Sequence, residues 1–382
     1  MRVLFVSLNE ALWGGSEVLW SKTAIEMARR GHRVDVFFPY HKDIEETRTL
    51  QQCGCELHFG TRPPTRWWKR LANPWGPPRA RFKNTLTSVS PELTVFSQGA
   101  IRACLPEMAM CRDRKVPYAI INQLTEPLGS VDHSCRDMRD AFQGALHAWF
   151  VSRENLDRAL RFLALLLPNA DVIPNAYACA FEPPATWPGS DHPFRLAVVA
   201  RLDPQQKGQD ILLDVLEQER WRKREWEISF FGEGAAREAL AERCRCSGIS
   251  SVAVAGSVAS PADIWNSHHG LILSSRYEGN SLSMIEAMLH GRPVIALPVG
   301  GTAGVVLDGE TGFLADRIDV EGLAAALERA WNARSSFRSL GENAARHIRT
   351  IVWRDPGAEM ANRLEALIPG SLAPMTSDPV PL

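Results

Sequence analysis

The sequence lacks the segments that would span a membrane or direct export. No apolar run approaches the roughly 20 residues that a membrane-spanning helix needs, and the longest, Phe162–Leu167, stops at Pro168. The apolar run at the N-terminus, residues 1–8, reaches Asn9 too soon for the core of a secretory signal. We therefore expect a cytoplasmic protein.

Motifs for metal and dinucleotide binding are also absent. The eight cysteines form no paired CxxC elements, which favours reduced thiols over a zinc site. No DxD triad and no GxGxxG fingerprint occur, so we expect no bound metal and no cofactor. Lys+Arg 43 against Asp+Glu 44 leave a net charge of -1, which gives no reason to expect nucleic acid as a partner.

What the sequence does contain is a regular alternation of strand and helix patterns. A strand at 2–7, a helix at 17–30 and a strand at 33–38 form a βαβ unit at the start of the chain. A second alternating series begins after the proline-rich stretch 183–193. A chain of 382 residues exceeds the size at which one hydrophobic core stops growing, so two domains are expected.

We therefore predict an α/β fold of two Rossmann-like, doubly wound domains that face each other across a cleft. The predicted ranges are 1–185 for the first domain, 194–350 for the second, 351–369 for a helix that crosses back to the first domain, and 370–382 for a flexible tail.

Three loops of this pattern offer groups that could bind an anion. Arg201 and Lys207 stand between a strand and a helix start, where two cations and helix amides suit a diphosphate. A solvated surface loop is the alternative. Gly14 and Gly15 precede the first helix and allow close backbone approach, although a glycine pair there is more often only a turn.

The third loop contains Glu278, followed after eight positions by Glu286. Ser283-x-x-Glu286 also matches a capping box, so Glu286 has a purely structural alternative. Glu278 lies outside any such pattern, and the residues after it offer backbone donors: Gly279, Asn280, Ser281 and Leu282.

Together these motifs resemble the retaining family 4 of the GT-B glycosyltransferases, also called glycosyl transferases group 1. The resemblance is dense from about 195 to 330 and thinner before that. The matching elements are Arg201-Leu202-x4-Lys207-Gly208, the Glu278/Glu286 pair, Glu286-Ala287-Met288-x2-Gly291-x-Pro293-Val294, Gly300-Gly301, and Asp308-Gly309-x2-Thr311-Gly312-Phe313-Leu314.

The resemblance implies a metal-independent, retaining transfer of a hexose-type sugar from a nucleotide-diphosphate donor. It assigns Arg201 and Lys207 to the diphosphate, Glu278 to the sugar hydroxyls and Glu286 to the ribose. It also assigns the amides of 279–282 and of Gly14 and Gly15 to a phosphate cradle, and Gly256, Ser257 and Val258 to the base. The acceptor would belong to polysaccharide, glycolipid or protein glycan assembly. A sugar-nucleotide epimerase and a non-catalytic sugar-nucleotide binding protein are the alternatives.

Two features depart from the resemblance or extend it. Many relatives have a histidine after the strand at 118–122 that touches the donor sugar. In this chain Asn122 or Gln123 would supply that hydrogen bond, and His133 is a more distant candidate. The segment from Arg62 to Lys83 is basic and contains tryptophans, which suits peripheral contact with an anionic membrane. A loop whose tryptophans pack on the core is the alternative there.

Overall fold

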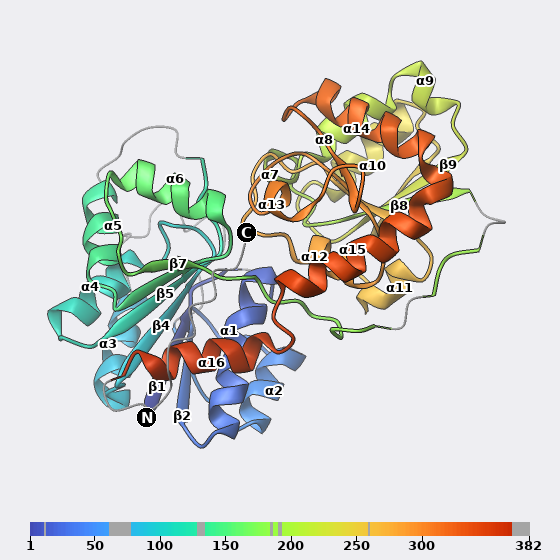
Figure 1. The fold of residues 1–382 in the computed structure, drawn as a ribbon. Coiled ribbons are helices and arrows are strands. Elements are labelled where there is room, and N and C mark those ends of the chain that lie inside the picture. Colours follow the sequence, from blue (N-terminus) through green and yellow to red (C-terminus); the bar gives the residue numbers. More distant parts are fainter. Residues whose placement is uncertain are drawn as a thin grey trace. The chain divides into compact units, whose positions relative to one another are not determined.

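The computed structural model describes residues 1–10, 13–60, 78–127, 134–183, 186–189, 193–258 and 260–368. They form two α/β units, each built on one parallel sheet (Figure 1). Among the described residues, one unit holds 1–176 and 355–368, and the other holds 177–354. The prediction of two Rossmann-like domains is confirmed.

The sheet of the first unit has seven strands in the order β3-β2-β1-β4-β5-β6-β7. Its strands are β1 (Arg2–Ser7), β2 (Arg33–Phe38), β3 (Glu56–Phe59), β4 (Leu93–Gln98), β5 (Tyr118–Asn122), β6 (His147–Phe150) and β7 (Ala170–Val172). Its helices are α1 (Gly15–Arg29), α2 (Glu45–Gln52), α3 (Pro78–Val89), α4 (Leu105–Asp113), α5 (Ser134–Gln143), α6 (Arg153–Leu163) and α16 (Pro356–Ala366).

The sheet of the second unit has six strands in the order β10-β9-β8-β11-β12-β13. Its strands are β8 (Phe194–Val199), β9 (Trp226–Phe231), β10 (Val252–Gly256), β11 (Gly270–Leu273), β12 (Val294–Ala296) and β13 (Gly312–Leu314). Its helices are α7 (Pro204–Lys207), α8 (Gln209–Leu216), α9 (Glu219–Arg222), α10 (Arg237–Cys246), α11 (Pro261–Trp265), α12 (Leu282–Leu289), α13 (Thr302–Val305), α14 (Val320–Asn332), the 3-10 turn η2 (Arg334–Ser336) and α15 (Phe337–Ile351).

The central strands are apolar along their length because both faces of a parallel sheet are covered. In β1, Val3 to Ser7 are all buried, as expected for a strand between two helical layers. The helix α1 instead buries one stripe, which includes Leu19, Trp20 and Met27. The two periodicities place the apolar face of α1 on the sheet.

The last helix, α16, packs against α1 within the first unit (Figure 1). Gly357 permits the contact, because a Cβ there would lie 2.8 Å from the carbonyl oxygen of Lys22. Arg30, the C-cap of α1, donates to Asn362 at 2.7 Å and to Glu365 at 3.0 Å. The C-terminal segment is therefore an integral part of the first unit.

The chain passes from one unit to the other at different residues from those of the predicted ranges. The chain leaves the first unit after Ala176, ahead of the proline-rich stretch, and returns to it at Asp355. The segment from Tyr177 onward belongs to the second unit because it is bonded there. The buried Arg292, for example, donates to the carbonyl oxygen of Thr186. The proposed tail, 370–382, lies outside the described residues.

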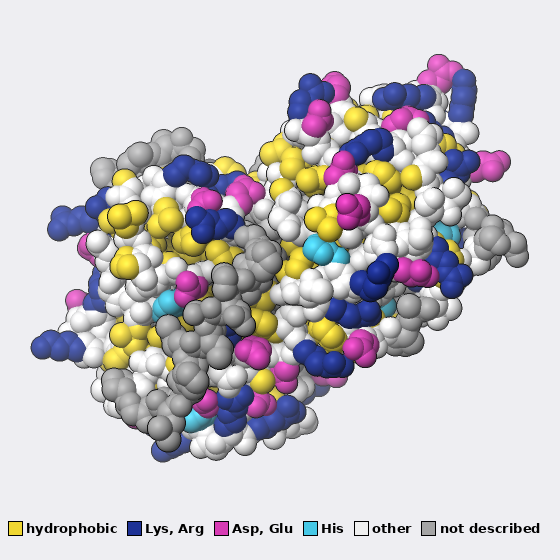
Figure 2. All heavy atoms as spheres, in the orientation of Figure 1, with side chains coloured by type: hydrophobic (Ala, Val, Ile, Leu, Met, Phe, Trp, Pro, Cys, Tyr) yellow, Lys and Arg dark blue, Asp and Glu magenta, His cyan; other side chains and the backbone are white. Residues whose placement is uncertain are grey.

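The surface shows no concentration of one charge on the displayed face. Figure 2 shows Lys and Arg side chains interspersed with Asp and Glu, as the net charge of -1 suggests. Within the described ranges, no helix combines the length and the apolar character needed to cross a bilayer. Most of the segment from Arg62 to Lys83, with its tryptophans, falls outside those ranges.

Candidate functional site

The strand order of the second unit reverses between β8 and β11. β8 is the first strand of this sheet in the chain, and its neighbours on the two sides are β9 and β11. Ligands of open parallel sheets bind outside the carboxyl ends of the strands at such a point. The connection from β8 to α8, which includes the short helix α7, carries Arg201 and Lys207, and the loop after β11 carries Glu278. These predicted site residues therefore lie on adjacent loops.

Lys207 and Glu278 form an ion pair between these loops. Lys207 Nζ lies 2.5 Å from Glu278 Oε1, and the two side chains are only 14% and 9% exposed. Ser275 Oγ donates to the same oxygen at 2.7 Å. A pair so shielded from water is held in one geometry by partners on both sides. The structure thus brings a fixed cation and a fixed carboxylate together.

The two loops are also joined through their backbones. Ser274 Oγ donates to the carbonyl oxygen of Lys207 at 3.0 Å, and the backbone N–H of Arg276 donates to the carbonyl oxygen of Gln206 at 2.8 Å. Gly208 has φ +61, and a Cβ on it would lie 1.9 Å from the carbonyl oxygen of Ser274. Only glycine permits this approach, which is why it directly follows Lys207.

Arg276 acts as a brace for the same loops. Its guanidinium donates to both carboxylate oxygens of Asp210, each at 2.7 Å, and to the carbonyl oxygen of Pro204 at 2.6 Å. The hydrogen bonds from Arg276 hold the pKa of Asp210 below its ordinary value. Because Asp210 neutralises it, Arg276 is a structural cation. The sequence pattern contains this residue but gives no sign of that pairing.

Arg201 is placed differently from Lys207. It is exposed, and its guanidinium donates to the side-chain oxygen of Gln206. Among the described residues no carboxylate forms an ion pair with Arg201. Its positive charge is therefore not neutralised by a neighbouring acid, unlike that of Lys207.

The turn from Gly279 to Leu282 rests on the predicted glycine pair Gly300 and Gly301. The amide of Gly301 donates to the carbonyl oxygen of Gly279 at 2.7 Å. A Cβ on Gly300, whose φ is +58, would lie 2.5 Å from the carbonyl oxygens of Glu278 and Gly279. The glycine pair thus packs directly against the turn. Ser281, the N-cap of α12, makes no side-chain hydrogen bond to that helix.

The capping-box alternative for Glu286 is wrong. α12 starts at Leu282, so Ser283 is already helical and Glu286 lies one turn further along. Glu286 Oε1 instead accepts a hydrogen bond from the amide of Ala178 at 2.8 Å. The side chain is 7% exposed. Sequence spacing could not reveal this bond because Ala178 lies 108 positions earlier.

Gly256 ends β10, and Ser257 and Val258 follow it; β9 separates β10 from β8. The amide of Ser257 donates to Glu233 Oε1 at 3.2 Å, and Glu233 pairs with Arg237 at 3.0 Å. These three residues therefore lie at the same carboxyl edge of the sheet as Lys207, two strands away.

Gly14 and Gly15 belong to the first unit, where Gly14 is the N-cap of α1 and Gly15 its first residue, at the reversal between β1 and β4. Glu17, one turn into α1, is buried, and its carboxylate accepts from Ser7 at 3.0 Å and from Asn9 at 3.0 and 3.1 Å. The network secures the glycine turn. Nothing in the sequence motif had indicated it.

The structure distinguishes Asn122 from Gln123 at the end of β5. The Asn122 side chain is fully buried, donates to Gln98 at 3.4 Å and accepts from Thr125 at 3.1 Å. Gln123 is 7% exposed, and its side-chain Nε2 has no hydrogen-bond partner among the described residues. Gln123 is thus the residue with a donor to offer. His133 lies outside the described residues.

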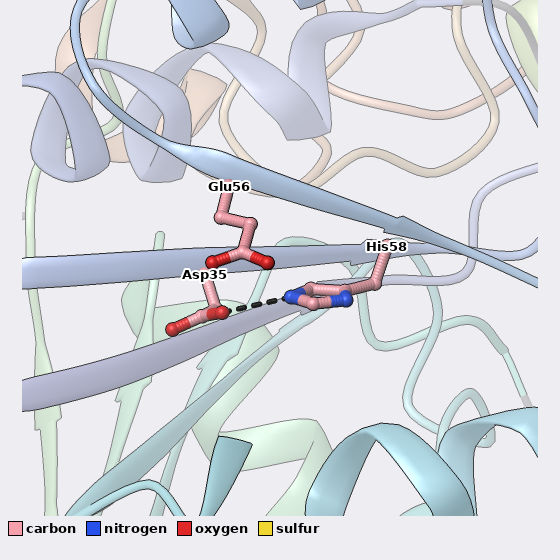
Figure 3. A group of neighbouring side chains, drawn as sticks. All are labelled: Asp35, Glu56 and His58. Atoms are coloured by element: carbon pink, nitrogen blue, oxygen red, sulfur yellow. Dashed lines mark hydrogen bonds and ion pairs between the residues drawn. The ribbon is translucent and has the colours of Figure 1, made fainter. Parts of the chain in front are cut away.

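Asp35, Glu56 and His58 on β2 and β3 form a cluster whose atoms lie close enough for a metal ion (Figure 3). His58 Nε2 lies 2.7 Å from Asp35 Oδ1, and Arg2 donates to both oxygens of Asp35 at 2.8 and 3.1 Å. Burial raises the pKa of Asp35, but the bonds from His58 and Arg2 outweigh it and leave that pKa lowered. Because Arg2 occupies the carboxylate, a structural ion cluster explains this geometry.

Comparison with known proteins finds a family match within the second unit. Residues 193–333 match the family model of the glycosyl transferases group 1. An uncharacterized glycosyltransferase of Methanocaldococcus jannaschii is 27% identical over 165 residues, which are 43% of this chain and 45% of the relative. A D-inositol 3-phosphate glycosyltransferase of Rhodococcus erythropolis is 34% identical over 126 residues, 32% of this chain and 28% of the relative. The matches thus span less than half the length of these curated relatives.

Solved structures match over almost the whole chain. Anabaena HepE in complex with UDP and glucose superposes with a TM-score of 0.77 at 17% identity, covering 95% of this chain and 99% of that one. Staphylococcus aureus TarM in complex with UDP and other ligands gives a TM-score of 0.73 at 12% identity, covering 95% and 99%. At these identities the likeness establishes the fold, and the predicted GT-B class is confirmed.

Proposed function

We propose that this chain is a retaining glycosyltransferase that moves a hexose-type sugar from a nucleotide-diphosphate donor to a glycan, lipid-linked or other acceptor. The observation that carries the proposal is the Lys207–Glu278 pair at the β8/β11 reversal, inside the segment that matches the family model. The UDP and sugar complexes of the structural neighbours support the choice of donor class.

The proposed roles follow from charge. Departure of a nucleoside diphosphate places negative charge on phosphate, and fixed cations and amides stabilise it. Arg201, which forms no ion pair with any acid of the described residues, and Lys207 would contact the diphosphate. The amides of 279–282 would assist. In this proposal no metal is required.

Glu278 would accept hydrogen bonds from the hydroxyls of the transferred sugar. Ser275 and Lys207 hold its carboxylate in place. The carboxylate oxygens are therefore positioned to accept hydrogen bonds before the sugar donor binds. Glu286 would take the ribose and 256–258 the base. The acceptor would attack from the leaving-group side, and the departing phosphate would receive its proton.

A donor screen tests the proposal. The protein is incubated with UDP-, GDP- and ADP-sugars, with and without EDTA, while release of nucleoside diphosphate and the melting temperature are recorded. We expect release that EDTA leaves unchanged, and a donor that raises the melting temperature because it binds only the folded state. Binding without turnover on any acceptor would favour a non-catalytic binder, and isomerised donor without a glycoside would favour an epimerase.

A further inference from the structure

The hydroxyl of Tyr177 joins the two places where the chain changes unit. The chain leaves the first unit between Ala176 and Tyr177 and returns to it between Arg354 and Asp355. Tyr177 is 2% exposed, and its hydroxyl lies 2.8 Å from the carbonyl oxygen of Trp353 and 2.9 Å from that of Arg354. One buried side chain therefore fastens the outgoing passage to the returning one.

The next residue connects this junction to α12. The amide of Ala178 donates to Glu286 Oε1 at 2.8 Å. Arg349 adds a second attachment, since it donates to the carbonyl oxygens of Phe181 and Leu289, each at 3.3 Å. Residues 177–181, which we call the exit segment, are thus bonded both to the middle and to the end of α12.

We propose that the exit segment positions Glu286 for the donor and links donor binding to both passages of the chain. The inference rests on the proposed function, in which Glu286 takes the ribose hydroxyls. A carboxylate whose one oxygen accepts a backbone N–H presents a defined direction to a ligand. Tyr177 holds that N–H in place, because its own backbone adjoins Ala178 and its hydroxyl is anchored at 353 and 354.

The link works in both directions. A ligand that favours the held orientation of Glu286 strengthens the hydrogen bond from Ala178. Loosening the exit segment therefore weakens binding of that ligand by the same factor. The alternative is that Glu286 only fastens the exit segment. In that case a nucleotide would leave hydrogen exchange in the exit segment and at 350–354 unchanged.

Hydrogen–deuterium exchange with and without UDP, GDP or ADP separates the two readings. We expect the nucleotide that binds to slow exchange at 177–181 and at 350–354. Tyr177→Phe should abolish the slowing of exchange at 350–354. It should also lower the affinity for that nucleotide by about two- to tenfold, the effect of one net hydrogen bond. Glu182→Gln is the matched control, because Glu182 directly follows the exit segment and its pair with Arg354 is exposed. This variant should behave as wild type.

Two substitutions at Glu286 test the positioning separately from the function. Glu286→Gln keeps a side-chain oxygen that can accept from Ala178, whereas Glu286→Ala does not. Without nucleotide, the Ala178 amide should exchange at the wild-type rate in the first variant and faster in the second. Equal exchange in both would overturn the positioning. Unchanged nucleotide affinity in Tyr177→Phe would overturn the link, and failure of all three nucleotides to bind wild type would overturn the proposed function and the link with it.

Discussion

Lys207 and Glu278 lie on loops 71 residues apart in the chain, yet their side chains meet at 2.5 Å. Each is therefore the other's counter-ion before any ligand arrives. A donor diphosphate would offer Lys207 a second anion, and a sugar hydroxyl would offer Glu278 a second donor. In the proposed function, the pair would bind both halves of the donor with a geometry that already exists before the donor arrives.

Lys207→Ala should remove phosphate stabilisation. We expect kcat/KM for diphosphate release to fall by about a hundredfold, the scale on which one fixed donor acts on a developing charge. Lys223→Ala is the control, because Lys223 forms an exposed surface pair with Glu219 in the same unit. Steady-state kinetics of both variants give the comparison, and equal rates would contradict the role of Lys207.

Gly208→Ala should be costly for two reasons. The residue has φ +61, and the added Cβ would lie 1.9 Å from the carbonyl oxygen of Ser274. We expect a loss of at least about 3 kcal/mol in the free energy of unfolding. Gly248→Ala isolates the first reason, since its φ is +64 and nothing lies within 4 Å of its Cβ position. It should cost about 1 kcal/mol in chemical denaturation, and equal losses would rule out the close approach.

Asn122 and Gln123 should separate stability from activity. Asn122→Ala removes a buried side-chain amide that makes two hydrogen bonds, so it should lower the melting temperature. Gln123→Ala should leave the melting temperature near that of wild type and reduce kcat/KM about tenfold, if its side-chain amide serves the donor sugar. Thermal melts and kinetics on the same preparations decide the matter, and a purely thermal effect of Gln123→Ala would remove that residue from the site.

The buried His269 should make the protein less stable in acid. Burial is the main cause that lowers the pKa of His269 from 6.5 to about 4, while its ring accepts from the amide of Arg195 at 3.0 Å. Between these pH values the unfolded chain binds the proton and the folded chain does not. The free energy of unfolding should thus fall as pH drops from 6.5 to about 4, by roughly 3 kcal/mol in total.

The check for this pH effect is a variant that cannot titrate. His269→Asn retains an acceptor for the Arg195 amide, so its unfolding should depend less on pH over that interval. Denaturation series at pH 7 and pH 4.5 measure the difference. The same slope in wild type and variant would show that other groups carry the acid sensitivity.

The periodicity of the sequence predicted several of the strands and helices at or near the residues where the structure has them. β1, β2 and β5 are predicted at their observed residues, because central strands are continuous apolar runs. β3 was missed because it has four residues and none of them is buried. An edge strand exposed to water leaves no such pattern.

The sequence by itself also determined the chemical types at the candidate site: two cations, two carboxylates and glycine turns in a fixed order. Only the tertiary structure decided how they pair. The neighbouring strands β8 and β11 bring Lys207 to Glu278. The exit segment lies against α12, so that Ala178 donates to Glu286. Local spacing governs helices and turns, whereas these bonds depend on which strands become neighbours, and that is set by packing of the whole domain.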